Sequence, residues 1–292
     1  MAPASPFARD EFEAGVAELR RLDLEAVYDD RVFARQRYEA GPAGLRAAAF
    51  RDAWFDDSIA ALVCARGGYG SVHLLPLLEA LPLGDRPKIL LGYSDNTSLL
   101  VWLTLERRIV SFHGPMIDGR FARGPQGYDS DTFRRVVWSA EPAGEIAHPA
   151  VEALKSGEAA GMLIGGTLTQ LLASLGTPYA FDPPAGHVLF IDEVAERPYR
   201  IDRMLTQLRL SGLLARASAL VFGELPRCDE PGGDPAIRSV VADLTADFPG
   251  PVLFGLPSGH TTGATLTLPF GVRTRVMTSP APRLVVEEPA VS

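Results

Sequence analysis

The sequence has only two cysteines, Cys64 and Cys228, and no long apolar run. Two cysteines so far apart do not make a disulfide framework, which favours a protein of a reducing compartment. An uncharged apolar stretch of about 18 residues would be needed to span a membrane, and none occurs. The first residues also lack the basic flank and apolar core of a signal peptide, so we expect a cytoplasmic protein that contacts no membrane.

Positive charge is scarce as well, since 28 Lys and Arg face 36 Asp and Glu and the net charge is −8. Binding to a phosphate backbone needs a basic surface, so nucleic acid is not an expected partner. Apolar residues are abundant at 47% of the chain, and 22% of the residues are charged. This balance is typical of a globular protein with one large domain or two of ordinary size.

Strand-like and helix-like segments alternate over the first 120 residues. Apolar runs of strand length occur at 59–65, 88–94 and 109–116, and a shorter one occurs at 24–28. Helical patterns occur at 6–22, 43–55, 71–81 and 95–108. This alternation predicts βαβ units and a parallel sheet, whose strands are apolar throughout because both faces are covered. We therefore expect a Rossmann- or flavodoxin-like α/β domain over residues 1–120, with Ser5 as the N-cap of its first helix.

The rest of the chain divides into a polar connection and a second domain. Residues 121–155 are rich in glycine, proline and polar side chains, and only 132–138 have a helical pattern. This composition indicates an interdomain linker. Residues 156–292 contain many short apolar runs, such as 161–166 and 187–192, together with two helical patterns. They predict a mixed, strand-rich C-terminal domain.

The turn Gly92-Tyr93-Ser94-Asp95 lies between a predicted buried strand and a predicted helix. Ligands of open α/β sheets bind beyond the carboxyl ends of the strands, where this turn would lie. A serine here has the setting of a nucleophile elbow, and the helix N-terminus behind it favours a developing negative charge. The pattern G-x-S-x-G is only half present, because Asn96 replaces the second glycine. From the turn alone, Ser94 is either a nucleophile or an ordinary helix cap.

A glycine-rich loop, RGGYG, follows another predicted strand at residues 66–70. It does not complete the dinucleotide pattern G-x-G-x-x-G, and no P-loop lysine follows it. We therefore do not expect a nucleotide site there. Glycines do let a main-chain N–H approach a substrate carbonyl, as an oxyanion hole requires.

None of the five histidines pairs with another at metal-ligand spacing, so a zinc site is not expected. His260 lies in a glycine-flanked turn after an apolar strand, where it is either a placed catalytic imidazole or a solvated side chain. Asp192 and Glu193 end a predicted buried strand, and one of them could orient a histidine. Alternatively, these carboxylates pair with Arg197 or Arg200.

Several of these stretches occur in the order found in one peptidase family. They are DSIAALVCARGGYGS, LLGYSDNTSLL, FHGPM, GGTLTQLLASLGTPYA, VLFIDEVAERPYRIDRMLTQLRLSGLL and LPSGHTTGATLTLPFG. With them the chain resembles the LD-carboxypeptidase family of serine peptidases, which includes murein tetrapeptide carboxypeptidases and microcin C self-immunity peptidases. The resemblance covers most of the chain and implies a triad of serine, histidine and an acid, built across two domains.

The resemblance assigns Ser94 as the nucleophile and His260 as the base, with Asp192 or Glu193 as the acid. We favour Asp192, because it is the first residue after the apolar strand and adjacent strand residues point to opposite faces. The family has glutamate at this position, so the shorter aspartate requires His260 to lie closer to it. No metal or cofactor is implied.

Substrate contacts follow from the same resemblance. The N–H groups of Gly68 and Asp95 would form the oxyanion hole, and Arg66 would meet the terminal carboxylate of the substrate. Thr167 stands where the family usually has an asparagine, so it is a substrate-binding candidate. The family's first β-strand is not found, because the APAS segment that usually follows it begins at residue 2. Either the start lies upstream or the sheet lacks one strand.

The implied reaction is release of terminal D-alanine from the L,D-peptide bond of murein tetrapeptide during peptidoglycan recycling, by a cytoplasmic homodimer. Two other functions stay open at this point. One is cleavage of an acyl-sulfamoyl-adenylate conjugate of the microcin C type. The other is non-catalytic binding of a small anionic peptide by the RGGYG and GYSD turns.

Overall fold

Three apolar runs of the first 120 residues and one strand from near the C-terminus form a four-stranded sheet. A computed structural model describes all 292 residues. The sheet has the order β1-β2-β3-β10, with β1 at Ala61–Val63, β2 at Ile89–Gly92, β3 at Ser111–His113 and β10 at Leu268–Phe270. The first three strands are parallel, as predicted, and β10 pairs antiparallel with β3. Met1 hydrogen-bonds to Val63 and Ala65 along the free edge of β1.

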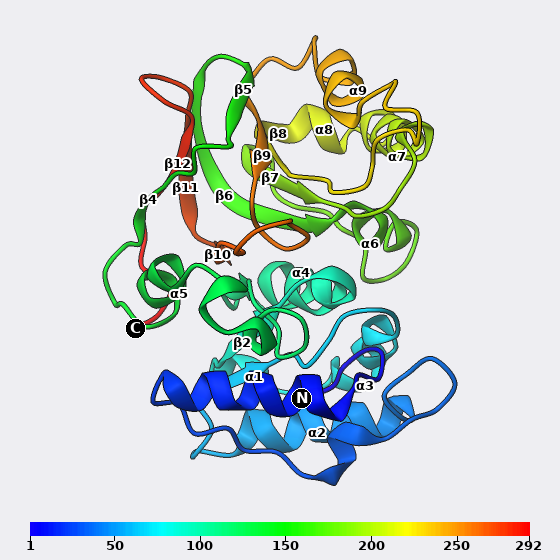
Figure 1. Ribbon diagram of the computed structural model, residues 1–292, viewed down its shortest axis with the longest axis vertical. Coiled ribbons are helices and arrows are strands. Elements are labelled where there is room, and N and C mark those ends of the chain that lie inside the picture. The colour runs from blue at the N-terminus through cyan, green and yellow to red at the C-terminus, as the bar shows by residue number, and fades with distance from the viewer.

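Eight strands form the second sheet, which lies in the upper lobe (Figure 1) in the order β4-β12-β11-β6-β7-β8-β9-β5. The strands are β4 Gly144–Ile146, β5 Glu152–Lys155, β6 Glu158–Thr167, β7 His187–Asp192, β8 Ala217–Gly223, β9 Val252–Leu256, β11 Arg273–Met277 and β12 Arg283–Val286. The central strands β6 to β9 are parallel, and the flanking pairs are antiparallel. The two sheets confirm the predicted fold class, a parallel α/β sheet followed by a mixed, strand-rich one.

The helices lie on the faces and edges of these sheets. They are α1 Arg9–Arg21, α2 Ala43–Phe55, α3 Leu75–Leu78, α4 Thr97–Glu106, α5 Ser130–Val137, α6 Leu168–Ala173, α7 Pro198–Leu210, α8 Leu213–Arg216 and α9 Ile237–Leu244. Short 3₁₀ helices are η1 Asp30–Phe33, η2 Ser71–Leu74, η3 Leu83–Asp85, η4 Ser94–Asn96 and η5 Phe121–Gln126. No helix is both long and apolar enough to cross a bilayer.

Helix α4 explains how the two lobes meet. It packs against β3 of the first sheet and against β6 and α6 of the second. Most of its side chains are therefore buried, and its sequence TSLLVWLTLE is apolar nearly all the way round. It follows β2 and η4 directly in the chain, and it lies between the two lobes in Figure 1.

Two local predictions are wrong. Residues 24–28 form no strand, because Val27 is 67% exposed and Tyr28 packs edge-on against Phe12 of α1 instead of joining a sheet. Ser5 does not cap α1, whose N-cap position is Ala8. The Ser5 hydroxyl instead accepts a hydrogen bond from the N–H of Tyr69 at 3.0 Å, and so supports the glycine-rich loop.

The segment 121–155 is not free of regular structure. It contains α5, which covers the predicted helical pattern, and the strands β4 and β5, which close the two edges of the eight-stranded sheet. Conversely, β10, which comes from the C-terminal part of the chain, pairs with β3 in the first sheet. The predicted division at residues 1–120, 121–155 and 156–292 stays a prediction.

Candidate active site

Ser94 stands in the turn that joins β2 to α4. Its backbone φ is +65°, in the left-handed region that residues other than glycine seldom adopt. Such strain at a strand-to-helix turn is typical of a nucleophile elbow. The Ser94 hydroxyl caps no backbone N–H of α4, whose N-cap position is Asn96. The Asn96 side chain donates to the carbonyls of Tyr93, at 3.1 Å, and Arg66, at 3.3 Å, and holds the turn against the glycine-rich loop.

Gly67 provides the space that the Ser94 side chain occupies. A Cβ on Gly67 would lie 2.7 Å from Cβ and 2.8 Å from Oγ of Ser94, closer than real side chains approach. Sequence reasoning gave Gly67 no individual role, although it lies within the RGGYG motif. Its lack of a side chain lets the loop approach the candidate nucleophile directly.

Gly68 and Asp95, the predicted oxyanion donors, are the residues that follow Gly67 and Ser94 in the chain, and their role stays a prediction. Gly68 has a φ of +103° and is exposed, and its N–H meets no acceptor within the protein. The buried Asp95 accepts from the N–H of Ser71 at 2.8 Å and from Nε2 of Gln170 at 3.2 Å. Burial raises the pKa of Asp95, although the hydrogen bonds from Ser71 oppose the rise. Asp95 therefore ties the glycine-rich loop to the Ser94 turn.

His260 is held by Asp192, the last residue of β7. Its Nδ1 lies 2.7 Å from Oδ2 of Asp192, and its backbone N–H donates to Oδ1 at 3.2 Å. A carboxylate can only accept, so the hydrogen belongs to Nδ1, and Nε2 is free to take a proton. Gly259 makes the approach feasible, because its φ is +75° and a Cβ there would lie 2.6 Å from Oδ2 of Asp192.

Burial and nearby charges act on the pKa of His260 in opposite directions. Burial lowers its pKa most, but the carboxylates of Asp192 and Glu193 outweigh burial, so the pKa of His260 is raised above its ordinary value. Asp192 is fully buried, and the imidazole side chain is 16% exposed. A partly exposed histidine whose imidazolium form is stabilised by a buried carboxylate is suited to act as a general base.

Glu193 points away from His260, as the alternation of strand side chains predicts. Its Oε2 accepts from the N–H and the hydroxyl of Thr169, at 2.9 and 2.6 Å, and so caps the start of α6. Burial raises the pKa of Glu193. Of the two adjacent carboxylates, only Asp192 contacts the imidazole. The two arginines considered as their partners bind Glu230 and Glu196 instead.

Tyr93 connects the two halves of the site. Its ring meets the His260 ring edge-on, with 5.1 Å between the centroids, and Ser94 is the next residue in the chain. No hydrogen bond joins the Ser94 hydroxyl to His260 within the protein. Such bonds are often long without substrate and tighten when it binds. The fold thus brings the serine turn of the first lobe beside the histidine turn of the second.

Of the two predicted substrate contacts, Arg66 already forms an ion pair and Thr167 is buried. Arg66 is half-exposed and pairs with Asp118 at 3.1 Å, so its guanidinium is not free. Thr167 is buried beside Asp192 in the parallel register of β6 and β7, and its hydroxyl has no hydrogen-bond partner. Its backbone N–H donates a hydrogen bond to Oγ1 of Thr97, in α4, at 3.1 Å, and so contributes to the contact between the two lobes.

His113, the last residue of β3, is a buried neighbour of this site with no role assigned from the sequence. Its Nδ1 lies 2.9 Å from the hydroxyl of Ser258, which itself donates to the carbonyl of Leu266. Nδ1 therefore carries the hydrogen, and the buried Nε2 has no partner. Burial lowers the pKa of His113 to about 4, so it is neutral near pH 7.

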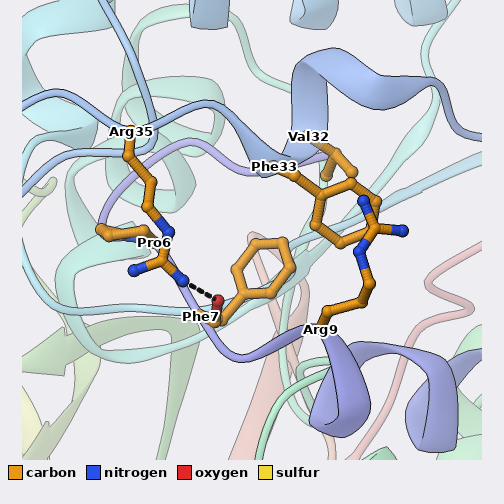
Figure 2. A pocket seen from close by; sticks show the side chains of 6 residues that line it. All are labelled: Pro6, Phe7, Arg9, Val32, Phe33 and Arg35. Carbon is orange, nitrogen blue, oxygen red and sulfur yellow. Dashed lines mark hydrogen bonds between the residues drawn. The ribbon is translucent and has the colours of Figure 1, made fainter.

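A surface pocket of about 140 Å³ contains none of these residues. Figure 2 shows its lining, which consists of Pro6, Phe7, Arg9, Val32, Phe33 and Arg35. Both arginines are occupied, since Arg9 lies 3.7 Å above the Phe33 ring and Arg35 donates to the carbonyl of Phe7 at 2.8 Å.

Comparisons with known proteins identify the family of this chain. Models of the LD-carboxypeptidase N-terminal and C-terminal domains match residues 1–114 and 160–276. A Streptomyces coelicolor protein named as a carboxypeptidase is 34% identical over 93% of this chain and 87% of its own length. The murein tetrapeptide carboxypeptidase of Pseudomonas aeruginosa is 30% identical over 89% of this chain and 86% of its own. The chain belongs to the LD-carboxypeptidase family.

A solved structure of this fold is the microcin C7 self-immunity protein MccF in complex with aspartyl sulfamoyl adenosine. It matches with a TM-score of 0.92 and 23% identity, over 100% of this chain and 96% of its own. The match shows that this chain has the same two-lobed fold.

The two carboxylates can be told apart by the pKa of His260, measured by NMR titration of the imidazole. Asp192→Asn should lower this pKa markedly, because the hydrogen-bonded carboxylate is lost. Glu193→Gln is the matched control and should lower it less, because Glu193 acts only at a distance. A larger fall in Glu193→Gln than in Asp192→Asn would contradict the assignment of Asp192 as the partner.

The space at Gly67 can be tested by adding one methyl group. Gly67→Ala should lower the kcat of the carboxypeptidase by about 100-fold, because the methyl displaces the Ser94 side chain. Gly84→Ala is the control, since nothing lies within 4 Å of a Cβ there. Circular dichroism would check that both variants fold. Full activity of folded Gly67→Ala would show that Ser94 does not need this space.

Proposed function

We propose that this LD-carboxypeptidase hydrolyses the L,D-peptide bond that releases terminal D-alanine from murein tetrapeptide. The observation that carries the proposal is the hydrogen bond from His260 to the buried Asp192, beside the strained turn of Ser94. Supporting it, the Pseudomonas aeruginosa relative is named as a murein tetrapeptide carboxypeptidase. The proposed triad is Ser94, His260 and Asp192.

In the proposed mechanism, Nε2 of His260 takes the proton of the Ser94 hydroxyl as Oγ attacks the scissile carbonyl carbon. The N–H groups of Gly68 and Asp95 stabilise the resulting oxyanion, each contributing about 3–4 kcal/mol. Collapse of the tetrahedral intermediate breaks the C–N bond, and His260 passes its proton to the leaving amine of D-alanine. A water molecule, activated by the same imidazole, then hydrolyses the acyl-enzyme.

The proposal extends to the biological setting expected from the family resemblance. We infer that the reaction serves peptidoglycan recycling in the cytoplasm and that the enzyme works as a homodimer without metal or cofactor. The substrate is small and carries several carboxylates, so a basic contact is needed near its end. Arg66 stays the candidate for this contact. The substrate carboxylate would then have to replace Asp118 as the partner of the Arg66 guanidinium.

A second substrate class is favoured by an exposed aromatic pair next to the predicted oxyanion hole. Tyr69 follows Gly68 and is 44% exposed, and Tyr38, 57% exposed, meets its ring edge-on at 5.5 Å. Aromatic faces of this kind can stack on a nucleobase. The alternative reaction is therefore cleavage of an aminoacyl sulfamoyl adenosine, the type of ligand named in the MccF structure.

The deciding experiment detects the products by mass spectrometry with two separate substrates: loss of D-alanine from murein tetrapeptide, and release of aspartate from aspartyl sulfamoyl adenosine. We expect tripeptide from the wild type and none from Ser94→Ala. The kcat/KM should rise with pH as His260 loses its proton, with a midpoint above the ordinary value of 6.5.

The other results discriminate between the remaining functions. Cleavage of the adenosine conjugate alone would move the assignment to the microcin type. Binding of tetrapeptide with turnover of neither substrate would favour a non-catalytic binding protein.

A further inference from the structure

Arg120 is a buried cation that pairs with no carboxylate. It lies between β3 and η5, and it is 5% exposed. A buried charge is costly unless its hydrogen-bonding groups are satisfied. Here the partners are main-chain carbonyls, so the guanidinium is committed to holding backbone in place.

All three carbonyls belong to the loop that carries His260. Nη2 of Arg120 donates to the carbonyl of Gly259 at 2.8 Å and to that of Thr261 at 2.9 Å, and Nη1 donates to Gly263 at 2.9 Å. Gly259 and Thr261 are the residues on either side of His260. The backbone is therefore fixed both before and after the imidazole.

The same guanidinium reaches the serine side of the site. Its Nε donates to the hydroxyl of Tyr93 at 3.4 Å, and its carbon lies 5.9 Å from the centre of the Tyr93 ring. Tyr93 directly precedes Ser94. One side chain thus contacts the turn of the nucleophile in the first lobe and the loop of the base in the second.

A second anchor holds the far side of the histidine loop. Glu224, which follows β8, accepts hydrogen bonds from the hydroxyl of Thr261 and from the N–H and hydroxyl of Thr262, the last two at 2.8 and 2.9 Å. Because Glu224 and this loop both belong to the second lobe, Glu224 can shape the loop but cannot set its distance from Ser94. That task falls to a residue reaching from the first lobe.

We propose that Arg120 is a positioning residue that sets the place of His260 relative to Ser94 by clamping the 259–263 loop onto Tyr93. This proposal rests on the proposed function for its effect on turnover. Its effect on the loop itself is independent of any substrate.

The charge of Arg120 provides a readout that a purely structural residue would not change. The groups facing His260 are Asp192 and Glu193 from β7, His113 from β3, Tyr93 after β2, and Arg120. Burial lowers the pKa of His260 most, the two carboxylates raise it, and the Arg120 guanidinium lowers it. Neutral His113 and Tyr93 add no charge near pH 7. Removing the cation should therefore raise the pKa of His260 and shift the acidic limb of the pH–rate profile to higher pH.

The test compares Arg120→Gln, Arg120→Lys and the control Arg123→Gln. Arg123 is an exposed arginine of the same segment whose side chain makes no hydrogen bond. The readouts are the pKa of His260 by NMR, hydrogen exchange of the 259–263 amides, and kcat and KM on murein tetrapeptide. The first two need no substrate, so they decide the proposal even if the wild type proves inactive on the tetrapeptide.

Arg120→Gln should lower kcat by about 10- to 100-fold with little change in KM, because a displaced base slows chemistry more than binding. It should also raise the pKa of His260 and speed exchange in the loop. Arg120→Lys keeps the positive charge but loses the planar guanidinium that binds several carbonyls at once. Hydrogen exchange of the 259–263 amides should therefore become faster, while the pKa of His260 stays near that of the wild type. Arg123→Gln should match the wild type in all three.

An unchanged pKa of His260 together with unchanged loop exchange in Arg120→Gln would overturn the proposal. If Arg120→Gln does not fold, Arg120→Lys decides, since it retains the buried charge. Faster loop exchange in Arg120→Lys would then support the clamp, and wild-type exchange would refute it.

Discussion

The arrangement of the site depends on one physical requirement: the fully buried carboxylate of Asp192 must be hydrogen-bonded. An ionised group taken out of water costs several kcal/mol unless hydrogen bonds replace its hydration. Asp192 meets this need at the end of β7 by accepting from both the ring and the backbone N–H of His260. The requirement explains why residue 259 is glycine, since any side chain there would collide with Oδ2.

Much of the fold could be predicted because hydrophobic pattern and burial agree in its central elements. The predicted helix 43–55 and strand 187–192 have the bounds found in the structure. The prediction failed where local pattern had no tertiary support, as at 24–28, which no neighbouring strand covers. The crossing of 268–270 into the first sheet could not be foreseen, because a three-residue strand has no sequence signal for its partner.

The chemistry-bearing residues were easier to find than the residues that position them. Ser94, Asp192 and His260 lie at strand ends, and motif order pointed to them together. The alternation of strand side chains also separated Asp192 from Glu193, and the contacts agree. Arg120 gave no signal, because its partners are carbonyls some 140 positions away in sequence. A residue that works through backbone contacts across two lobes leaves no motif of its own.

The central claim is that Ser94 is a nucleophile activated by His260, and covalent labelling tests it most directly. A fluorophosphonate would form a P–O bond with an activated serine oxygen and release fluoride. Peptide mass spectrometry should find a single adduct, on Ser94, and labelling should be lost in a folded His260→Gln variant. An adduct on another serine, or equal labelling of Ser94 without His260, would contradict the account.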